Sequence, residues 1–428
     1  MKVIIMAGGK GTRIASVKAD VPKPMIPILE KPILQYEIEC LKRQGFCDIV
    51  LVVGHLGQVI KDYFQDGSRF GVHISYVTET EPLGTAGALY LLKEQLTEDF
   101  LLLNGDIIFD VDIERFAAYH QKCGGVATLL THPNNHPYDS GIIEADENGC
   151  VENWLHKEDP RGWYQNRVNA GLHMLSPQIF EDVAGMGLFQ SCKKVDLDRD
   201  VLKPLIPTGG LYVYDTTEYV KDMGTPDRFY SVIEDIQSGK VYAKNRRNLQ
   251  KAIFLDRDGT INRYVGFLTR IEDFELLPGV AEAIKKINAS GYLAIVVTNQ
   301  PVIARGEVTV EQLQEIHKKM ETLLGQEGAY VDGIYYCPHH PHRGYEGEIP
   351  ELKIDCSCRK PKPGMLLQAA EDFHIDLAQS WMIGDGENDV TAGKQAGCRT
   401  ILLSTEQNEV GQTKTAGSLQ EAVNEILG

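Results

Sequence analysis

Short apolar runs alternate with longer amphipathic stretches along the whole chain. Each run has the length of a buried strand and is followed by glycine or polar residues. Such runs occupy residues 2–6, 48–53, 73–77 and 100–106 in the first half, and 251–256, 292–299, 332–337 and 380–385 in the second. The pattern predicts an α/β fold built largely on parallel strands in both halves. Between the strands we expect helices, such as residues 34–45, which end on a glycine.

A polar, basic stretch separates the two series of strands. It reads "QSGKVYAKNRRNLQK", residues 237–251, and shows no hydrophobic periodicity. The chain has 428 residues, more than a single hydrophobic core usually supports. We therefore predict an N-terminal domain over residues 1–237, a linker over 238–250 and a C-terminal domain over 251–428.

Composition and charge restrict the partners. The net charge of −17 disfavours non-specific binding to nucleic acid or to anionic membranes, because both surfaces repel an acidic protein. No apolar run reaches the roughly 18 residues of a membrane span. Nine cysteines are scattered, apart from three between Cys337 and Cys358, so no disulfide framework is expected. These features predict a cytoplasmic protein, and they say nothing about its oligomeric state.

The first half opens with a glycine-rich loop, "MAGGKGTRI", between a strand and an expected helix. Glycines allow backbone N–H groups to approach phosphates, and the helix N-terminus adds a favourable dipole. A plain glycine turn would look the same. Lys23, between two prolines in "DVPKPM", is a second candidate for binding phosphate. Asp106 and Asp222, each beside a glycine turn, could hold one Mg²⁺, although a helix cap is the simpler reading for Asp106 alone.

Taken together, "AGGKGTR", "VPKPM", "PLGTAGAL", "NGD", "VNAG" and "DMGTPDR" resemble the sugar-1-phosphate nucleotidyltransferases. The likeness covers residues 1 to about 237 and favours the branch with mannose-1-phosphate and D-glycero-D-manno-heptose-1-phosphate guanylyltransferases. It implies a Rossmann-like domain with a mixed sheet, in which Arg13 and Lys23 are catalytic and Asp106 and Asp222 hold Mg²⁺. The implied nucleotide-binding residues are Ala7, Gly8, Gly9, Gly11, Thr12, Glu81, Gly84 and Thr85, and those for the sugar phosphate are Gly105, Lys157, Asn169 and Gly171.

The reaction of this family needs no covalent intermediate. A sugar phosphate attacks the α-phosphorus of GTP or another nucleoside triphosphate, and pyrophosphate leaves; positioning and charge neutralisation supply the catalysis. The chain departs from the family at Lys157, which stands in "HKED" where relatives often have "EKP". That departure weakens the assignment of Lys157 to the sugar phosphate.

The second half opens with "KAIFLDRDGTIN", a strand that ends in two aspartates. Side chains alternate along a strand, so Asp256 and Asp258 can emerge on one face. Two carboxylates this close repel unless a cation neutralises them. The arrangement suits a nucleophile beside a general acid, although a metal-free turn remains the alternative.

Further strand ends complete an ordered series: Thr298 and Asn299, then Lys360 in "CRKPKPGM", then Asp385 with Asp389 one helical turn later. The series resembles the haloacid-dehalogenase-like phosphatases over residues 251 to about 428. The resemblance implies a Rossmannoid domain in which Asp256 attacks phosphorus and Asp258 protonates the leaving alcohol. It also implies phosphoryl binding by Thr298 and Lys360, substrate contacts from Asn299, Gln300 and Arg359, and Mg²⁺ held by Asp256, Asp258 and Asp385.

Two close pairs of metal-binding residues lie in one loop of this half. Cys337 and His339 form the first, and Cys356 and Cys358 the second. Three thiolates and an imidazole favour tetrahedral Zn²⁺ with a structural role. His340 or His342 could replace His339, and reduced cysteines without metal are the competing interpretation.

This zinc-binding loop resembles that of the D,D-heptose 1,7-bisphosphate phosphatases and, more distantly, of histidinol-phosphate phosphatases. Gly386 and Pro301 stand where the heptose branch usually has lysine and serine, near the expected substrate phosphates.

We expect a bifunctional enzyme that dephosphorylates heptose 1,7-bisphosphate and transfers a guanylyl group from GTP to heptose 1-phosphate. One alternative pairs mannose 1-phosphate, or another nucleotidyl acceptor, with a histidinol-phosphate-like or other phosphatase. Another makes the first half a sugar-nucleotide sensor; the presence of Arg13, Lys23, Asp106 and Asp222 disfavours it.

Overall fold

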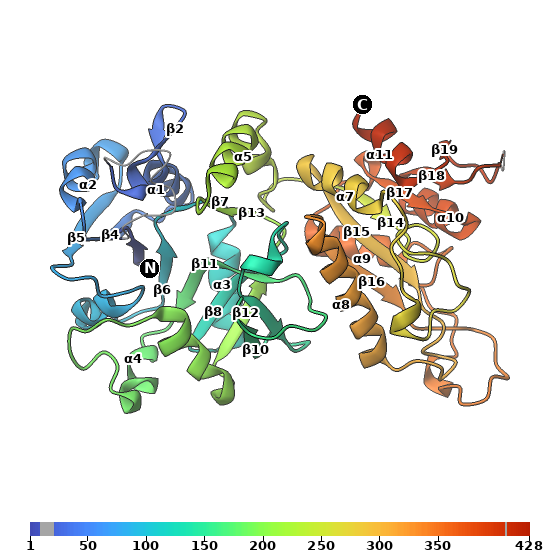
Figure 1. Cartoon of the computed structure of the whole chain (residues 1–428), viewed down its shortest axis with the longest axis horizontal. Helices are drawn as coiled ribbons and strands as arrows, with labels where there is room; N and C mark the ends of the chain where they lie inside the picture. The colour runs from blue at the N-terminus through green and yellow to red at the C-terminus, as the bar shows by residue number, and fades with distance from the viewer. Residues whose placement is uncertain (9–20, 407–408) are drawn as a thin grey trace. The chain divides into compact units, whose positions relative to one another are not determined.

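The computed structural model describes residues 1–8, 21–406 and 409–428 (Figure 1). Its contacts group the chain into two compact units. Unit 1 comprises Met1–His132, Ile143–Trp154 and Asn169–Asn245, and unit 2 comprises Pro133–Ile142, Leu155–Val168 and Arg246–Gly428. The division after Asn245 lies inside the stretch that we expect to be a linker, and two short pieces of the first half group with unit 2.

Unit 1 is built on a mixed nine-stranded sheet, with β10-β9-β11-β6-β1-β4-β5 in one path; β8 pairs with β11, and β12 pairs with β8. β1 pairs in parallel with both β4 and β6, whereas β11 pairs antiparallel with β6. β7 and β13 form a separate antiparallel ribbon. The strands are β1 Val3–Met6, β2 Pro27–Ile28, β3 Lys31–Pro32, β4 Asp48–Val53, β5 His73–Thr78, β6 Phe100–Asn104, β7 Ile107–Asp110, β8 Ala127–His132, β9 Ile142–Ala145, β10 Val151–Leu155, β11 Val168–Leu175, β12 Leu211–Asp215 and β13 Tyr219–Asp222.

Both faces of this sheet are covered, which explains why its central strands are apolar throughout. Val3 and Ile5 of β1 pack with α1, α2 and α3, while Ile4 between them packs into a second core that includes α4. The helices of the first half are α1 Ile33–Arg43, α2 Gly57–Phe64, α3 Ile113–Cys123, α4 Ile179–Asp182, α5 Pro226–Gln237 and α6 Lys240–Ala243. α1 ends two residues before the expected glycine, and Gly45 follows it with φ +85°.

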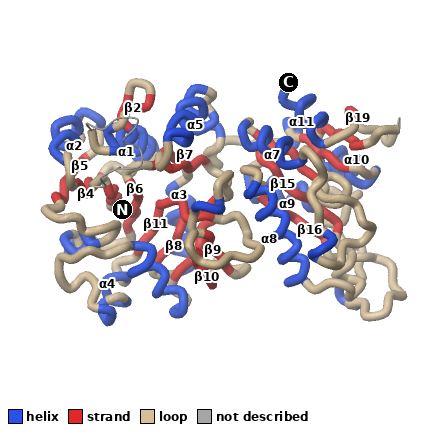
Figure 2. Tube along the Cα trace, in the orientation of Figure 1, coloured by secondary structure: helices blue, strands red, loops and turns tan. Residues whose placement is uncertain are grey.

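Unit 2 has a six-stranded sheet in the order β16-β15-β14-β17-β18-β19, and all of its pairings are parallel. Figure 2 shows helices on both sides of these strands. Side chains of α7, α8 and α11 pack on one face with Ile253 and Leu255, and those of α9 and α10 on the other with Phe254. The elements are β14 Lys251–Leu255, α7 Val280–Ala289, β15 Tyr292–Asn299, α8 Val310–Gln326, β16 Gly333–Cys337, α9 Gly364–Phe373, β17 Trp381–Gly384, α10 Glu387–Ala396, β18 Arg399–Leu403, β19 Lys414–Ala416 and α11 Leu419–Leu427.

The expected fold class is confirmed: an α/β chain with a mixed sheet first and a parallel sheet second. Within the described part of the chain, no helix combines the length and the apolar character needed to cross a membrane.

Candidate active sites

The two aspartates expected to share Mg²⁺ in the first half lie on neighbouring backbone segments. Asp222, the last residue of β13, is opposite Ile107 of β7, and the N–H of Met223 donates to the carbonyl of Asp106 at 3.0 Å. The antiparallel ribbon therefore brings together residues more than a hundred positions apart. Lys23, held between its prolines, places its ammonium against the Asp106 carboxylate.

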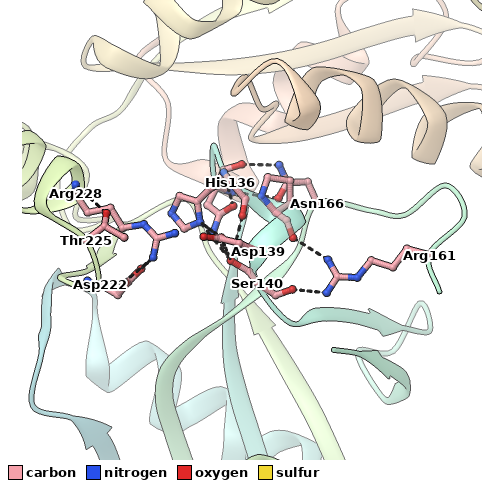
Figure 3. A network of polar contacts seen from close by, with 11 residues as sticks. His136, Asp139, Ser140, Arg161, Asn166, Asp222, Thr225 and Arg228 are labelled. Atoms are coloured by element: carbon pink, nitrogen blue, oxygen red, sulfur yellow. Dashed lines mark hydrogen bonds and ion pairs between the residues drawn. The ribbon is translucent and has the colours of Figure 1, made fainter. Parts of the chain in front are cut away.

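Asp222 has a cation of its own, as Figure 3 shows. Nη1 of Arg228 lies 2.9 Å from Oδ1 and 3.0 Å from Oδ2 of Asp222. Arg228 stands in the first turn of α5, whose N-cap is Thr225. Because both carboxylates already face a positive side chain, a metal ion here would share them with Lys23 and Arg228. Carboxylate oxygens at the end of a strand remain suitable ligands for Mg²⁺.

The buried carboxyl group of Glu37 lies next to this site. Glu37 of α1 is 1% exposed, and its Oε1 accepts the N–H of Ile107 at 3.1 Å. Burial raises the pKa of Glu37 well above its usual range, and the nearby Asp106 raises it further. Through its hydrogen bond to Ile107, Glu37 fixes the backbone that carries Asp106.

The glycine-rich loop that we expect to bind phosphate lies mostly outside the described residues, which exclude Gly9, Gly11, Thr12 and Arg13. Its described part is compact: Ala7 is 1% exposed, and a β-carbon on Gly8 would lie 2.6 Å from Oε2 of Glu79. In the second small-residue loop, Gly84 has φ +79° and lies against the backbone of Val195. Thr85 accepts the N–H of Leu197 at 2.7 Å, and Glu81 is exposed.

The residues expected to contact the sugar meet where β6 and β11 pair. Gly171 has φ +76°, and a β-carbon there would lie 2.7 Å from the side-chain amide of Asn104. Oδ1 of Asn169 accepts the N–H of Gly171 and lies 3.1 Å from Nε2 of His173. Gly105 is buried against Met6. Lys157 is exposed and belongs to unit 2, so its relation to the others stays a prediction.

In unit 2, Asp256, Asp385 and Asp389 bring carboxylate oxygens within 4.8 Å of one another. The Lys360 ammonium lies 2.7 Å from Asp256 and 2.6 Å from Asp389. Burial, followed by repulsion from Asp389, raises the pKa of Asp256 to about 7. Burial and then Asp256 raise that of Asp385 to about 6. A single lysine thus leaves this cluster short of positive charge, and a divalent cation would fit it.

Asp258 is held by a rigid set of donors. Arg257, fully buried, contacts both of its carboxylate oxygens, with Nη2 2.8 Å from Oδ2. Gln300 donates to Oδ2 at 2.9 Å, and also to Oγ1 of Thr298 at 2.9 Å. Asn262 donates to Oδ1 at 3.0 Å. The two aspartates of "DRD" therefore have different surroundings: Asp256 shares the Lys360 ammonium with Asp389, and Asp258 faces Arg257.

The strand end at Asn299 orients the loop that carries Lys360. The amide of Asn299 makes two hydrogen bonds of 3.0 Å with the backbone of Lys360, one to the carbonyl and one from the N–H. Arg359 donates to the carbonyl of His339 at 3.2 Å. Gly259, with φ +88°, leaves room for Asp385, because a β-carbon would overlap that carboxylate.

The four residues expected to bind zinc converge. The three sulfur atoms lie 3.2–3.5 Å apart, too far for a disulfide, and Nδ1 of His339 lies 3.3 Å from Cys358 and 3.6 Å from Cys337. These separations are close to the roughly 3.7 Å edge of a tetrahedral zinc–thiolate site with ~2.3 Å bonds. His340 instead points Nδ1 at the carbonyl of His342. The donor set suits zinc, with His339 as the fourth ligand.

Comparison with known proteins follows this geometry. Residues 2–239 match the family described as Nucleotidyl transferase. The chain belongs to this family. Beyond the nucleotidyl transferase part, residues 357–426 match a family described as HAD-hydrolase-like.

Curated relatives identify the branch of the second half. D-glycero-β-D-manno-heptose-1,7-bisphosphate 7-phosphatase of Haemophilus ducreyi is 46% identical over 155 residues, which is 36% of this chain and 82% of that protein. The Escherichia coli K12 phosphatase of the same name is 45% identical over 152 residues, 36% of this chain and 78% of that protein. This nucleotidyl transferase chain therefore also belongs to that phosphatase family, and both expected enzyme classes are confirmed.

Solved structures give weaker likenesses. HddC from Yersinia pseudotuberculosis aligns with 27% identity and a TM-score of 0.47, over 55% of this chain and 99% of that one. D,D-heptose 1,7-bisphosphate phosphatase from B. bronchiseptica, complexed with magnesium and phosphate, aligns with 32% identity and a TM-score of 0.36, over 42% and 98%. At these TM-scores neither likeness is evidence of function.

Several contributors were missed by sequence reasoning. Glu37 lies inside an ordinary amphipathic helix and His173 inside a buried strand, so neither pattern marked its residue as part of a site. Arg228 lies inside "DMGTPDR" and Arg257 inside "DRD", so their positions were a usable signal, although the directions of their side chains were not. Asp389 was noted for its spacing alone, and the structure adds its contact with Lys360.

Proposed function

We propose that the chain catalyses two consecutive steps. The second half removes the 7-phosphate of D-glycero-D-manno-heptose 1,7-bisphosphate. The first half then transfers a guanylyl group from GTP to the resulting heptose 1-phosphate and releases pyrophosphate. The observation that carries the proposal is the 46% identity to a heptose bisphosphate phosphatase, on a chain whose other half matches a nucleotidyl transferase over residues 2–239.

The phosphatase step uses the paired carboxylates of "DRD". An oxygen of Asp256 attacks phosphorus, the bond to the sugar oxygen breaks, and Asp258 gives that oxygen a proton. Thr298 and the Lys360 ammonium hold the phosphoryl oxygens, with Lys360 already 2.7 Å from the nucleophile. Water then releases phosphate from Asp256, with Asp258 accepting the proton. Bound Mg²⁺, held by Asp256, Asp385 and the carbonyl of Asp258, would supply charge neutralisation.

The transferase step depends on positioning. Lys23, Arg13 and the N–H groups around Gly8 bind the triphosphate, while Asn169 and Gly171 orient the sugar. Asp106 and Asp222 would hold Mg²⁺, which neutralises the phosphates. The phosphate oxygen of the sugar attacks the α-phosphorus in line with the leaving pyrophosphate. GDP-heptose formed in the cytoplasm would serve lipopolysaccharide or capsule assembly.

The experiment compares wild type with Asp256→Asn, which keeps the size of the side chain and removes the nucleophile. With heptose 1,7-bisphosphate, GTP and Mg²⁺, the wild type releases phosphate, then pyrophosphate, and forms GDP-heptose. The variant loses phosphate release by about a thousandfold or more. Supplied with heptose 1-phosphate, it forms GDP-heptose at the wild-type rate.

Two outcomes would overturn the proposal. If the variant guanylylates the bisphosphate as fast as the monophosphate, dephosphorylation does not precede transfer. If the wild type uses neither heptose compound, the sugar is wrong. In that case mannose 1-phosphate and a panel of nucleoside triphosphates identify the acceptor and the base.

A further inference from the structure

Three loops of unit 2 meet around one guanidinium group, that of Arg305. The loops follow β14, β15 and β16, which are neighbours in the sheet. Cζ of Arg305, in the loop after β15, lies 4.1 Å from the ring centre of Phe267 in the loop after β14. It lies 4.4 Å from the ring centre of Tyr345 in the loop after β16. Arg305 therefore links the loop that carries it to an aromatic residue of each neighbouring loop.

The surroundings hold the guanidinium in this position. The Arg305 side chain is 15% exposed and pairs with Glu307 at 2.6 Å. Among the described residues, its Nε is buried without a hydrogen-bond partner, so the guanidinium is held by the ion pair with Glu307 and by the two aromatic rings. A cation largely removed from water attracts an aromatic face more strongly than an exposed one does.

The loop after β16 is itself braced behind Tyr345. Lys353, 4% exposed, lies 4.4 Å from the Tyr345 ring centre and 3.3 Å from Glu348. Glu348 also accepts the N–H groups of Gly344 and Tyr345 at 2.9 and 3.0 Å. The Tyr345 ring that faces Arg305 is therefore also held by contacts within its own loop.

Backbone contacts bring the loops after β15 and β16 together as well. The N–H of Ile349 donates to the carbonyl of Ala304 at 3.0 Å. Gly306 has φ +72°, and a β-carbon there would overlap the carbonyl of Gly347. The loop after β14 is held differently: Phe267 is 52% exposed, and its contact with Arg305 attaches it to the other two.

These loops leave the carboxyl edge of the sheet, where Asp256 and Thr298 also lie. Ligands of open α/β sheets bind at that edge. We propose that Arg305 is a positioning residue for the phosphatase: it holds the three loops together as a wall that receives the sugar-phosphate portion of the substrate beyond the transferred phosphoryl group. This inference deepens the proposed function and rests on it for the identity of the sugar.

Replacing Arg305 should therefore weaken substrate binding without slowing phosphoryl transfer. Arg305 is not one of the groups that contact Asp256, so replacing it should leave the chemistry of a small phosphate ester intact. A large substrate, which needs the wall, should bind less well. A role in folding alone would instead lower activity on every substrate together.

The experiment uses the full chain with Arg305→Met, which removes the charge and planarity, and Arg305→Lys, which keeps only the charge. Arg115→Met, an exposed arginine on α3 in unit 1, is the matched control. We expect Arg305→Met to raise KM for heptose 1,7-bisphosphate about tenfold, because both cation–π contacts of the guanidinium are lost. The kcat for that substrate and kcat/KM for p-nitrophenyl phosphate should change less than about twofold. Arg305→Lys should lie between, and the control should match wild type.

Hydrogen exchange provides the second measurement. Peptides covering 263–268 should exchange faster in Arg305→Met than in wild type or Arg115→Met, with zinc content unchanged. Unchanged exchange there, or equal losses on both substrates, would overturn the positioning role. If the wild type hydrolyses p-nitrophenyl phosphate but not the heptose bisphosphate, the proposed substrate fails, and the exchange comparison still decides the role of Arg305.

Discussion

The ammonium of Lys360 lies 2.7 Å from the carboxylate of Asp256, the residue proposed to attack phosphorus. Both side chains are largely buried, at 2% and 15% exposure. Burial lowers the pKa of Lys360, but Asp256 and Asp389 more than offset that effect and raise it overall. Lys360 therefore stays charged, able both to neutralise the resting carboxylates and to bind a phosphoryl group placed between them.

Replacing Lys360 with methionine should therefore lower both the phosphatase activity and the stability of the second half. Phosphatase kcat/KM should fall about a thousandfold, because the variant lacks the preorganised charge that faces the phosphoryl oxygens. The second half should also lose about 3–5 kcal/mol of stability at pH 8, since a buried carboxylate is left without its partner. That loss should shrink at pH 5, where Asp256, with a pKa of about 7, is protonated. Steady-state kinetics and thermal unfolding at the two pH values check both effects. Equal destabilisation at both would contradict the charge argument.

Much of this arrangement could be predicted from the sequence, because the signals that indicate it are local in the chain. Apolar runs end directly in Asp256, Thr298 and Asp385, and parallel strands bring their carboxyl ends to one edge, so the chain order alone predicts the cluster. Arg257 and Gln300 around Asp258 depend on side-chain direction, which the pattern does not contain.

Contacts between segments far apart in the chain could not be predicted from the sequence. The antiparallel pairing that places Asp222 opposite Ile107 depends on register. The grouping of 133–142 and 155–168 with unit 2 has no counterpart in the composition of those stretches.

A substitution in the first half should abolish nucleotidyl transfer without affecting the phosphatase activity of the second half. Asp106→Asn removes the charge that faces Lys23 and would hold Mg²⁺, so nucleotidyl transfer should fall about a hundredfold or more. Phosphate release from heptose 1,7-bisphosphate should remain at the wild-type rate, because its residues lie in the other sheet. Asp62→Asn, an exposed position on α2, is the matched control. Coupled assays for pyrophosphate and phosphate measure the two steps separately. Equal loss of both activities in a folded variant would contradict the assignment of one activity to each half.

Metal analysis should find about one zinc per chain in protein prepared without chelator. Cys356→Ser should lose that zinc, since it removes one of four converging donors, and Cys192→Ser, exposed and outside the cluster, should keep it. Structural zinc sites contribute about 10–16 kcal/mol of apparent binding energy, so the loop over 338–355 should become open to proteolysis in Cys356→Ser. Zinc-free wild type, or full zinc in Cys356→Ser, would exclude this site.

Acid should destabilise unit 1 through His173. This histidine is 2% exposed, and burial lowers its pKa to about 3. Unfolded histidine binds a proton below about pH 6.5, whereas the folded side chain stays neutral until about pH 3. The contribution to stability is therefore present above pH 6.5 and is lost as the pH falls, by at most about 1.4 kcal/mol per pH unit.

The measurement is urea unfolding at pH 7, 6 and 5 for His173 and His173→Gln proteins. Trp154, 1% exposed, is the tryptophan of unit 1, whereas Trp163 and Trp381 belong to unit 2. Replacing those two with phenylalanine makes fluorescence report on unit 1 alone. His173→Gln cannot take up a proton at this position when it unfolds, so its free energy of unfolding should fall less steeply from pH 7 to pH 5. The difference between the two slopes isolates this imidazole from all other titrating groups. Identical slopes would mean that His173 is protonated in the folded chain, and then its contact with Asn169 would carry a charge into the proposed sugar site.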